Sequence, residues 1–324
     1  MPPVDTTIRT SAVDDQTVVS DCRWGEPLGP FKIYSSEHRP ALTDHDIHLW
    51  TVAVEPSREL ALDDPAANGA AADQKADLPS LDLPWLGDLN EEERVRALRF
   101  VRRRDGYRFA LVRRALRRLL GLYTSVQPSA IQFALGPQGK PQLAEALGKS
   151  DIQFNVSHSA TCALIGLRRQ LPVGVDIEQQ RLEVDFDGVA RLMFSASETA
   201  WLSSVAPEER GASFYRLWSR KEAILKCVGW GLGGPRPTTS WSVHPRATER
   251  WPLPELESVP GYDPAQARLL LVDLEPPTPA GLGRAPEVSA ARWPLQGYSA
   301  SVAAWSEPAA SSIRLRLGHY HDFA

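Results

Sequence analysis

Cysteine is scarce in this chain of 324 residues, which contains three: Cys22, Cys162 and Cys227. They are widely spaced and form no CxxC pair, so the sequence predicts neither a disulfide framework nor a thiolate metal cluster. A reducing compartment fits this pattern best. The N-terminus lacks the basic-then-apolar order of a signal peptide, and no run approaches the roughly 18 apolar residues of a membrane span. We therefore expect a cytoplasmic protein without membrane contact.

A strong excess of charge of one sign is also missing. The formal net charge is −4 at pH 7, which argues against a surface built as a whole for nucleic acid or anionic membrane. Any basic site must therefore be local. With 43% hydrophobic residues, the chain can bury one large core or two medium ones, since domains usually contain about 100 to 200 residues.

The chain divides at stretches that lack hydrophobic periodicity. Residues 1–44 mix Pro, Ser, Thr and Asp, and residues 56–84 are rich in Ala, Asp and Pro. We expect a flexible leader over 1–44 and an N-terminal half over 45–170, with an insertion or linker at 56–84. A C-terminal half is expected over 171–310, followed by a tail over 311–324.

Helical and strand patterns occur together in each half, which favours two mixed α/β halves. Asn90 can cap one helix, and a second helix is predicted over 105–120, ended by Gly121. Residues 195–198 have the S-x-x-E form of a capping box, and a long helix is predicted over 208–228. Short apolar runs predict strands at 46–54, 131–134, 152–156, 162–167, 173–177, 241–243, 267–274 and 298–305.

Two carboxylates lie two residues apart on one of the predicted strands. Residues at this spacing point to the same face, so Asp176 and Glu178 are expected to project together while Val175 and Ile177 face the core. Like charges this close favour a hard cation such as Mg²⁺ between them. The simpler alternative is a strand end that exposes two solvated acids.

The long helix contributes a third carboxylate. Trp218, Glu222 and Lys226 follow at i, i+4 and i+8 and therefore lie along one stripe. Glu222 is a candidate third metal ligand. The alternative is an ordinary ion pair between Glu222 and Lys226, worth roughly 0.2 to 0.5 kcal/mol on an exposed helix. Trp218 is expected to be a packing residue.

Four short motifs in a fixed order are the most specific feature of the sequence. They are GKP at 139–141, FNVSHS at 154–159, GVDIE at 174–178, and WSRKEAILK at 218–226 followed by GWGL. With this series the chain resembles the surfactin-type 4′-phosphopantetheinyl transferases over about residues 46–305. The resemblance implies a fold of two pseudo-symmetric halves, each a small, mainly antiparallel sheet packed with helices.

The resemblance also implies an activity. Such enzymes act as monomers in fatty acid, polyketide or nonribosomal peptide biosynthesis, as holo-[acyl-carrier-protein] synthases. They transfer the 4′-phosphopantetheine arm of coenzyme A to a serine of an acyl or peptidyl carrier protein and release 3′,5′-ADP. The cofactor is Mg²⁺, with Mn²⁺ as a substitute, and no nucleic acid is involved.

The motifs assign roles to individual residues by resemblance. Asp176, Glu178 and Glu222 are expected to hold Mg²⁺ against the diphosphate of coenzyme A. Asp176 and Lys226 are also expected at the coenzyme A site, where the Lys226 ammonium stabilises charge on the phosphate. Glu222 is the expected base for the serine hydroxyl.

Basic and polar residues of the N-terminal half match further coenzyme A contacts. The resemblance implies that Ser157 and His158, at the end of a strand, contact the nucleotide, with His158 at the 3′-phosphate and Lys140 in the same pocket. Arg96 and Arg108 match positions that approach the phosphates, where a planar guanidinium can donate two bonds. The alternatives are a structural histidine and a solvated turn lysine.

Arginine is dense between residues 94 and 118. Most of these side chains are expected to solvate two helices, and some could steer an acidic carrier protein. The main alternative function is a nucleic-acid-binding module that tracks phosphates with helices 94–118, which leaves the carboxylates without a role. A third is a carrier-binding scaffold without activity, which the three carboxylates argue against.

Overall fold

The computed structural model describes eleven stretches of the chain. They are residues 22–24, 29–30, 39–54, 84–136, 139–144, 151–181, 183–230, 238–243, 268–274, 295–306 and 313–320. The insertion predicted at 56–84 lies outside these residues except for Pro84, and so does most of the leader predicted at 1–44.

Most of the predicted helices and strands are present, with shifted ends. The helices are η2 (Pro84–Asp88), α2 (Glu91–Leu98), α3 (Arg103–Thr124), η3 (Pro128–Ala130), α4 (Phe186–Met193), α5 (Ala196–Ser204), α6 (Pro207–Val228) and η5 (Thr238–Ser240). The strands are β1 (Cys22–Trp24), β2 (Gly29–Pro30), β3 (Asp46–Ala53), β4 (Phe133–Leu135), β5 (Pro141–Leu143), β6 (Ile152–Ser159), β7 (Cys162–Arg169), β8 (Val173–Gln179), β9 (Arg268–Asp273), β10 (Tyr298–Ser306) and β11 (Ile313–Tyr320). None of the helices in the described stretches is long and apolar enough to cross a membrane.

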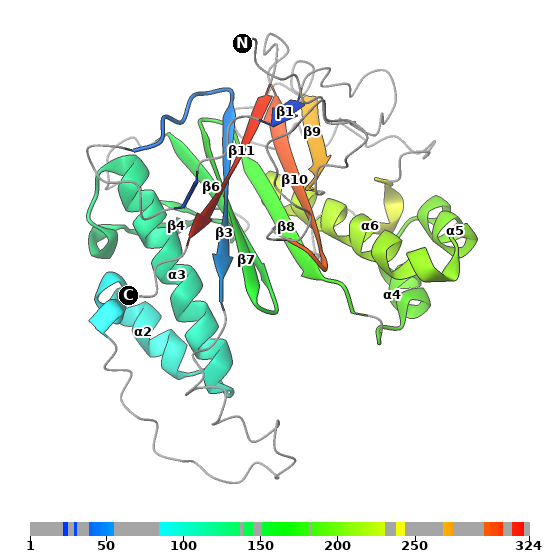
Figure 1. The fold of residues 1–324 in the computed structure, drawn as a ribbon, viewed down its shortest axis with the longest axis horizontal. Helices are drawn as coiled ribbons and strands as arrows, with labels where there is room; N and C mark the ends of the chain where they lie inside the picture. The colour runs from blue at the N-terminus through cyan, green and yellow to red at the C-terminus, as the bar shows by residue number, and fades with distance from the viewer. Residues whose placement is uncertain are drawn as a thin grey trace.

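In the described residues, two main sheets, a short two-stranded sheet of β4 and β5, and two helical layers make up the fold (Figure 1). The larger sheet has the order β1-β11-β3-β7-β6, with β2 also paired to β11, and the smaller sheet has the order β8-β10-β9. One apolar core lies between the sheets, a second joins the larger sheet to α3, and a third joins the smaller sheet to α4, α5 and α6. The predicted α/β fold of two halves, each combining antiparallel strands with helices, is confirmed.

The predicted tail at 311–324 is wrong for residues 313–320. They form β11, which pairs in parallel with β3 and so belongs to the sheet of the N-terminal half. Alternation explains the pairing, because Ile313, Leu315 and Leu317 are buried in the core between the sheets while Arg314 binds Asp46 with its Nε 2.8 Å from Oδ1. The leader contributes β1 and β2, which also pair in parallel with β11.

Two other local predictions are wrong. Gly121 does not end α3, which continues to Thr124 and stops at Ser125, where φ is 61°. Gly121 is needed for close packing, because a Cβ there would lie 2.7 Å from the Val126 carbonyl oxygen. Residues 241–243, predicted to be a strand, form no strand and directly follow η5.

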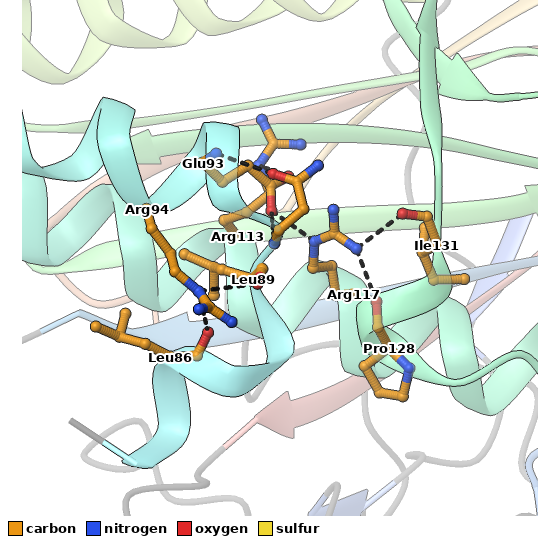
Figure 2. Close-up of polar contacts among 9 residues, drawn as sticks. Leu86, Leu89, Glu93, Arg94, Arg113, Arg117, Pro128 and Ile131 are labelled. Atoms are coloured by element: carbon orange, nitrogen blue, oxygen red, sulfur yellow. Dashed lines mark hydrogen bonds and ion pairs between the residues drawn. The ribbon is translucent and has the colours of Figure 1, made fainter. Parts of the chain in front are cut away.

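A buried ion pair ties α2 to α3 in the N-terminal half (Figure 2). Glu93 closes the capping box of α2 with Asn90 and accepts a hydrogen bond of 2.7 Å from Arg117 Nε of α3. The Arg117 side chain is fully buried and also donates to the carbonyls of Pro128 and Ile131, at 2.7 and 2.8 Å. One guanidinium therefore joins the start of α2 to the turn after α3.

The C-terminal half repeats this arrangement with other residues. Glu198 closes the capping box of α5 with Ser195, and its Oε2 lies 2.9 Å from Lys221 Nζ of α6. Lys221 in turn donates to the carbonyls of Thr238 and Trp241, at 2.6 and 2.7 Å. Each half therefore contains a buried ion pair between the capping acid of one helix and a basic residue of the next, which the sequence did not reveal.

Candidate active site

Strand β8 presents its two carboxylates to α6. Val175 and Ile177 lie in the core between the sheets, so Asp176 and Glu178 project to the other face, as the alternation predicted. Gly174 makes the close approach to α6 feasible, because a Cβ there would lie 2.0 Å from a backbone carbonyl oxygen of that helix. The glycine of GVDIE is therefore required by packing.

Asp176 is the most buried of the three candidate metal ligands, with 1% of its surface exposed. Its Oδ1 accepts from Lys226 Nζ at 2.6 Å and from Ser157 Oγ at 2.9 Å, and Lys226 Nζ also donates to Ser157 Oγ at 2.9 Å. Its Oδ2 is buried without a hydrogen-bond partner. Burial raises the pKa of Asp176, and the Lys226 ammonium opposes this rise. Lys226 of α6 therefore forms an ion pair across to β8.

Glu178 is held from two elements. Its Oε2 accepts from Ser159 Oγ of β6 at 2.9 Å, and its carboxylate is hydrogen-bonded by the Trp218 side chain of α6. Burial raises the pKa of Glu178, and the charge of Asp176 raises it further. Trp218, expected to be a packing residue, therefore also contacts a candidate metal ligand.

Glu222 lies within electrostatic reach of both strand carboxylates. Burial raises its pKa, Lys226 opposes the rise, and Asp176 and Glu178 add to it. Trp218, Glu222 and Lys226 are all half-buried, which confirms the stripe predicted along this helix.

The three acids supply the hard oxygen donors that Mg²⁺ prefers. Burial raises the pKa values of Glu178 and Glu222 and neighbouring acids raise them further, and Asp176 Oδ2 has no hydrogen-bond partner, so these side chains suit a cation. Within the described part of the chain, however, no three His, Cys, Asp or Glu side chains are arranged to hold an ion as they stand. Metal binding by Asp176, Glu178 and Glu222 thus remains a prediction.

His158 and Arg108 lie near the same site. β6 extends to Ser159, so Ser157 and His158 lie within the strand rather than at its end. Desolvation lowers the pKa of His158, and the positive charges of Lys226 and Arg108 lower it further. A side chain surrounded by such charges suits an anion.

The other two basic residues predicted to contact coenzyme A, Lys140 and Arg96, interact with other parts of the protein. Lys140 Nζ donates to the carbonyls of Val173 and Cys227, at 2.9 and 3.2 Å, and burial lowers its pKa. It therefore ties the start of β8 to the end of α6. Arg96 is exposed, with its guanidinium 4.9 Å from the centre of the Phe109 ring. Their contacts with coenzyme A remain predictions.

The dense arginines on α3 have internal partners. Arg114 and Arg117 are buried, at 3% and 0% exposed, and bind Asp88 and Glu93. Arg118 also binds Asp88, at 2.6 Å. A phosphate-tracking face cannot use side chains enclosed in this way, which weakens the nucleic-acid hypothesis.

Sequence reasoning missed Asn155 and Ser159 of β6. Both belong to a ladder with Ser157, at every second residue of the strand, and both bind backbone N–H groups of β8. The period of two in N-x-S-x-S was a readable signal, since such residues share one face of a strand.

Comparison with known proteins identifies the family of both halves. The model of the 4′-phosphopantetheinyl transferase superfamily matches residues 172–261, and the model of the 4′-phosphopantetheinyl transferase N-terminal region matches residues 85–168. The chain is 31% identical over 191 residues to the 4′-phosphopantetheinyl transferase HetI of Nostoc, covering 59% of this chain and 72% of HetI.

Two further relatives agree. The 4′-phosphopantetheinyl transferase Sfp of Bacillus subtilis is 29% identical over 174 residues, which cover 54% of this chain and 75% of Sfp. The Synechocystis protein slr0495, named as a candidate 4′-phosphopantetheinyl transferase, is 39% identical over 146 residues. That match spans 45% of this chain and 59% of the relative, less than two thirds of its length.

Proposed function

The chain belongs to the 4′-phosphopantetheinyl transferase family, and on that premise we propose that it transfers the phosphopantetheine arm of coenzyme A to a serine of an acyl or peptidyl carrier protein. One observation carries the proposal. The charges of β8 and α6 act on one another: burial raises the pKa of Glu222, Lys226 opposes this rise, and Asp176 and Glu178 add to it, which supports a shared site. This grouping suits the diphosphate of coenzyme A together with a divalent cation.

Asp176, Glu178 and Glu222 are the residues that would hold Mg²⁺. When bound, the ion supplies Lewis-acid stabilisation of the diphosphate oxygens. The Lys226 ammonium, 2.6 Å from Asp176 in the described state, lies where it can share the growing negative charge. Arg108 supplies positive charge near His158, whose ring can donate a hydrogen bond, and both features support the proposed contact with the 3′-phosphate of coenzyme A.

The proposed transfer is a single displacement at phosphorus. The carrier serine oxygen forms a bond to the β-phosphorus as the bond from that phosphorus to the bridging oxygen breaks, and 3′,5′-ADP leaves with the electron pair. Glu222 takes the serine proton. A carboxylate at this position can accept the proton directly or through one water.

A mass-shift assay tests the proposal. Apo acyl and peptidyl carrier proteins incubated with coenzyme A, Mg²⁺ and the protein should gain the mass of one phosphopantetheine arm. Glu222→Gln should slow transfer by about 10²- to 10³-fold, on the scale of losing one preorganised charge-stabilising group. Glu209→Gln is the matched control, because Glu209 is exposed in the first turn of the same helix.

Two outcomes would contradict the proposal. If no carrier in a broad panel gains mass, the activity is wrong. If carriers are modified and Glu222→Gln is as active as Glu209→Gln, the assignment of the site is wrong while the activity stands.

A further inference from the structure

We infer that Ser159 is a positioning residue, which holds the Glu178 carboxylate in place for the divalent ion. This inference rests on the proposed function, because it adds a supporting side chain to the same metal site. Ser159 lies on β6 of the N-terminal half, whereas Glu178 lies on β8 of the C-terminal half. The site would therefore depend on contact between the halves.

Ser159 is one rung of a side-chain ladder on β6. Backbone pairing binds one edge of β8 to β10, and the ladder binds N–H groups of every second β8 residue at the other edge. The bonds run from Val175 N to Asn155 Oδ1 at 2.9 Å, from Ile177 N to Ser157 Oγ at 3.4 Å, and from Gln179 N to Ser159 Oγ at 3.1 Å.

The single proton of the Ser159 hydroxyl has a defined target. A serine hydroxyl can accept two hydrogen bonds and donate one. Since Ser159 Oγ accepts from the Gln179 N–H, its proton is directed to Glu178 Oε2, 2.9 Å away. Ser157 serves Asp176 in the same way.

The third rung shows what the serines add. Asn155 binds the Val175 N–H, and the residue before Val175 is Gly174, which has no carboxylate to hold. The Asn155 rung therefore joins the strands alone, whereas the Ser159 rung joins the strands and orients an acid. This difference provides a matched control.

Contacts from α6 complete the hold on each acid. Glu178 is hydrogen-bonded by both Ser159 and Trp218. Asp176 is likewise bonded by Ser157 and Lys226. Side chains that orient a metal ligand typically change metal affinity or activity by about 10- to 100-fold when removed.

The test compares Ser159→Ala, Ser159→Thr and Asn155→Ala with the unsubstituted protein. Free and bound Mn²⁺ are measured by electron paramagnetic resonance in the absence of substrate, alongside thermal unfolding. We expect Ser159→Ala to weaken Mn²⁺ binding by about 10-fold or more, and Ser159→Thr to restore it because the hydroxyl returns. Asn155→Ala should lower the unfolding temperature and keep the Mn²⁺ affinity.

Transfer assays provide the second readout. In Ser159→Ala, the Mg²⁺ concentration for half-maximal rate should rise by a similar factor of about 10, while kcat recovers at saturating Mg²⁺. A loss of kcat that Mg²⁺ does not rescue would indicate a general structural defect and overturn the inference.

Other results distinguish a wrong role for Ser159 from a wrong transferase activity. Normal Mn²⁺ affinity in Ser159→Ala, or equal weakening in Ser159→Ala and Asn155→Ala, overturns the role of Ser159 and leaves the transferase proposal intact. Failure of a folded Ser159→Thr to regain affinity also overturns it. An unsubstituted protein that binds Mn²⁺ but modifies no carrier refutes the transferase activity alone.

Discussion

Breaking the buried pair of Glu198 and Lys221 should strongly destabilise the half that contains the Glu222 helix. Glu198 is fully buried, and Lys221 is 3% exposed. The Lys221 ammonium lies 2.9 Å from Glu198 Oε2 and donates to the carbonyls of Thr238 and Trp241. Lys221→Met removes these bonds and leaves the Glu198 carboxylate buried without an opposite charge.

The expected cost follows from this enclosure. Removing one partner of a buried pair typically lowers the free energy of unfolding by about 3 to 5 kcal/mol. Because whole domains are stable by only about 5 to 15 kcal/mol, the loss should be large. Glu198 Oε1 also accepts a hydrogen bond of 2.7 Å from the Val243 N–H. This bond does not replace the positive charge of Lys221, so the Glu198 carboxylate would remain buried without an opposite charge.

Urea unfolding at pH 7, followed by tryptophan fluorescence, measures the effect. A surface pair is the control: Glu91 lies 3.9 Å from Arg94, with the two side chains 82% and 41% exposed, so Glu91→Ala should change stability by about 0 to 1 kcal/mol. Adding Glu198→Gln to Lys221→Met should recover part of the loss, since no charge is left buried. A Lys221→Met protein as stable as Glu91→Ala would refute the reasoning.

Three further predictions concern buried or half-buried side chains. Burial lowers the pKa of His48 from 6.5 to about 3, so only the unfolded chain takes up a proton at this side chain as the pH falls from 6.5 to 5. The free energy of unfolding should then drop by roughly 1 to 2 kcal/mol, and by less in His48→Gln, as measured by urea unfolding at both pH values. Lys226→Met should slow transfer by about 100-fold or more in the mass-shift assay, because Asp176 loses its cation, and a near-normal rate would count against its role. Burial raises the pKa of Cys162 to about 12 and of Cys227 to about 11, so iodoacetamide at neutral pH should label both in urea and neither in the folded protein, as checked by mass spectrometry.

Local patterns were sufficient for much of the fold. The capping boxes at Asn90 and Ser195 were readable because each is satisfied within four residues. The alternation around Asp176 and the i, i+4 spacing of Glu222 on α6 correctly assigned their faces, since strand and helix periods depend on the backbone alone. The sequence alone therefore identified the carboxylates of the candidate site.

Only the tertiary structure decided which groups meet across the two halves. The N-x-S-x-S alternation of β6 indicates a shared face, but its contact with the β8 carboxylates depends on how the sheets pack. The same holds for residues 313–320, whose alternating apolar side chains became a strand of the N-terminal sheet because the C-terminus returns beside β3. Local sequence sets the period and the ends of an element, whereas partners about 20 to 270 residues apart are chosen by the shape and charge of the surfaces that fold together.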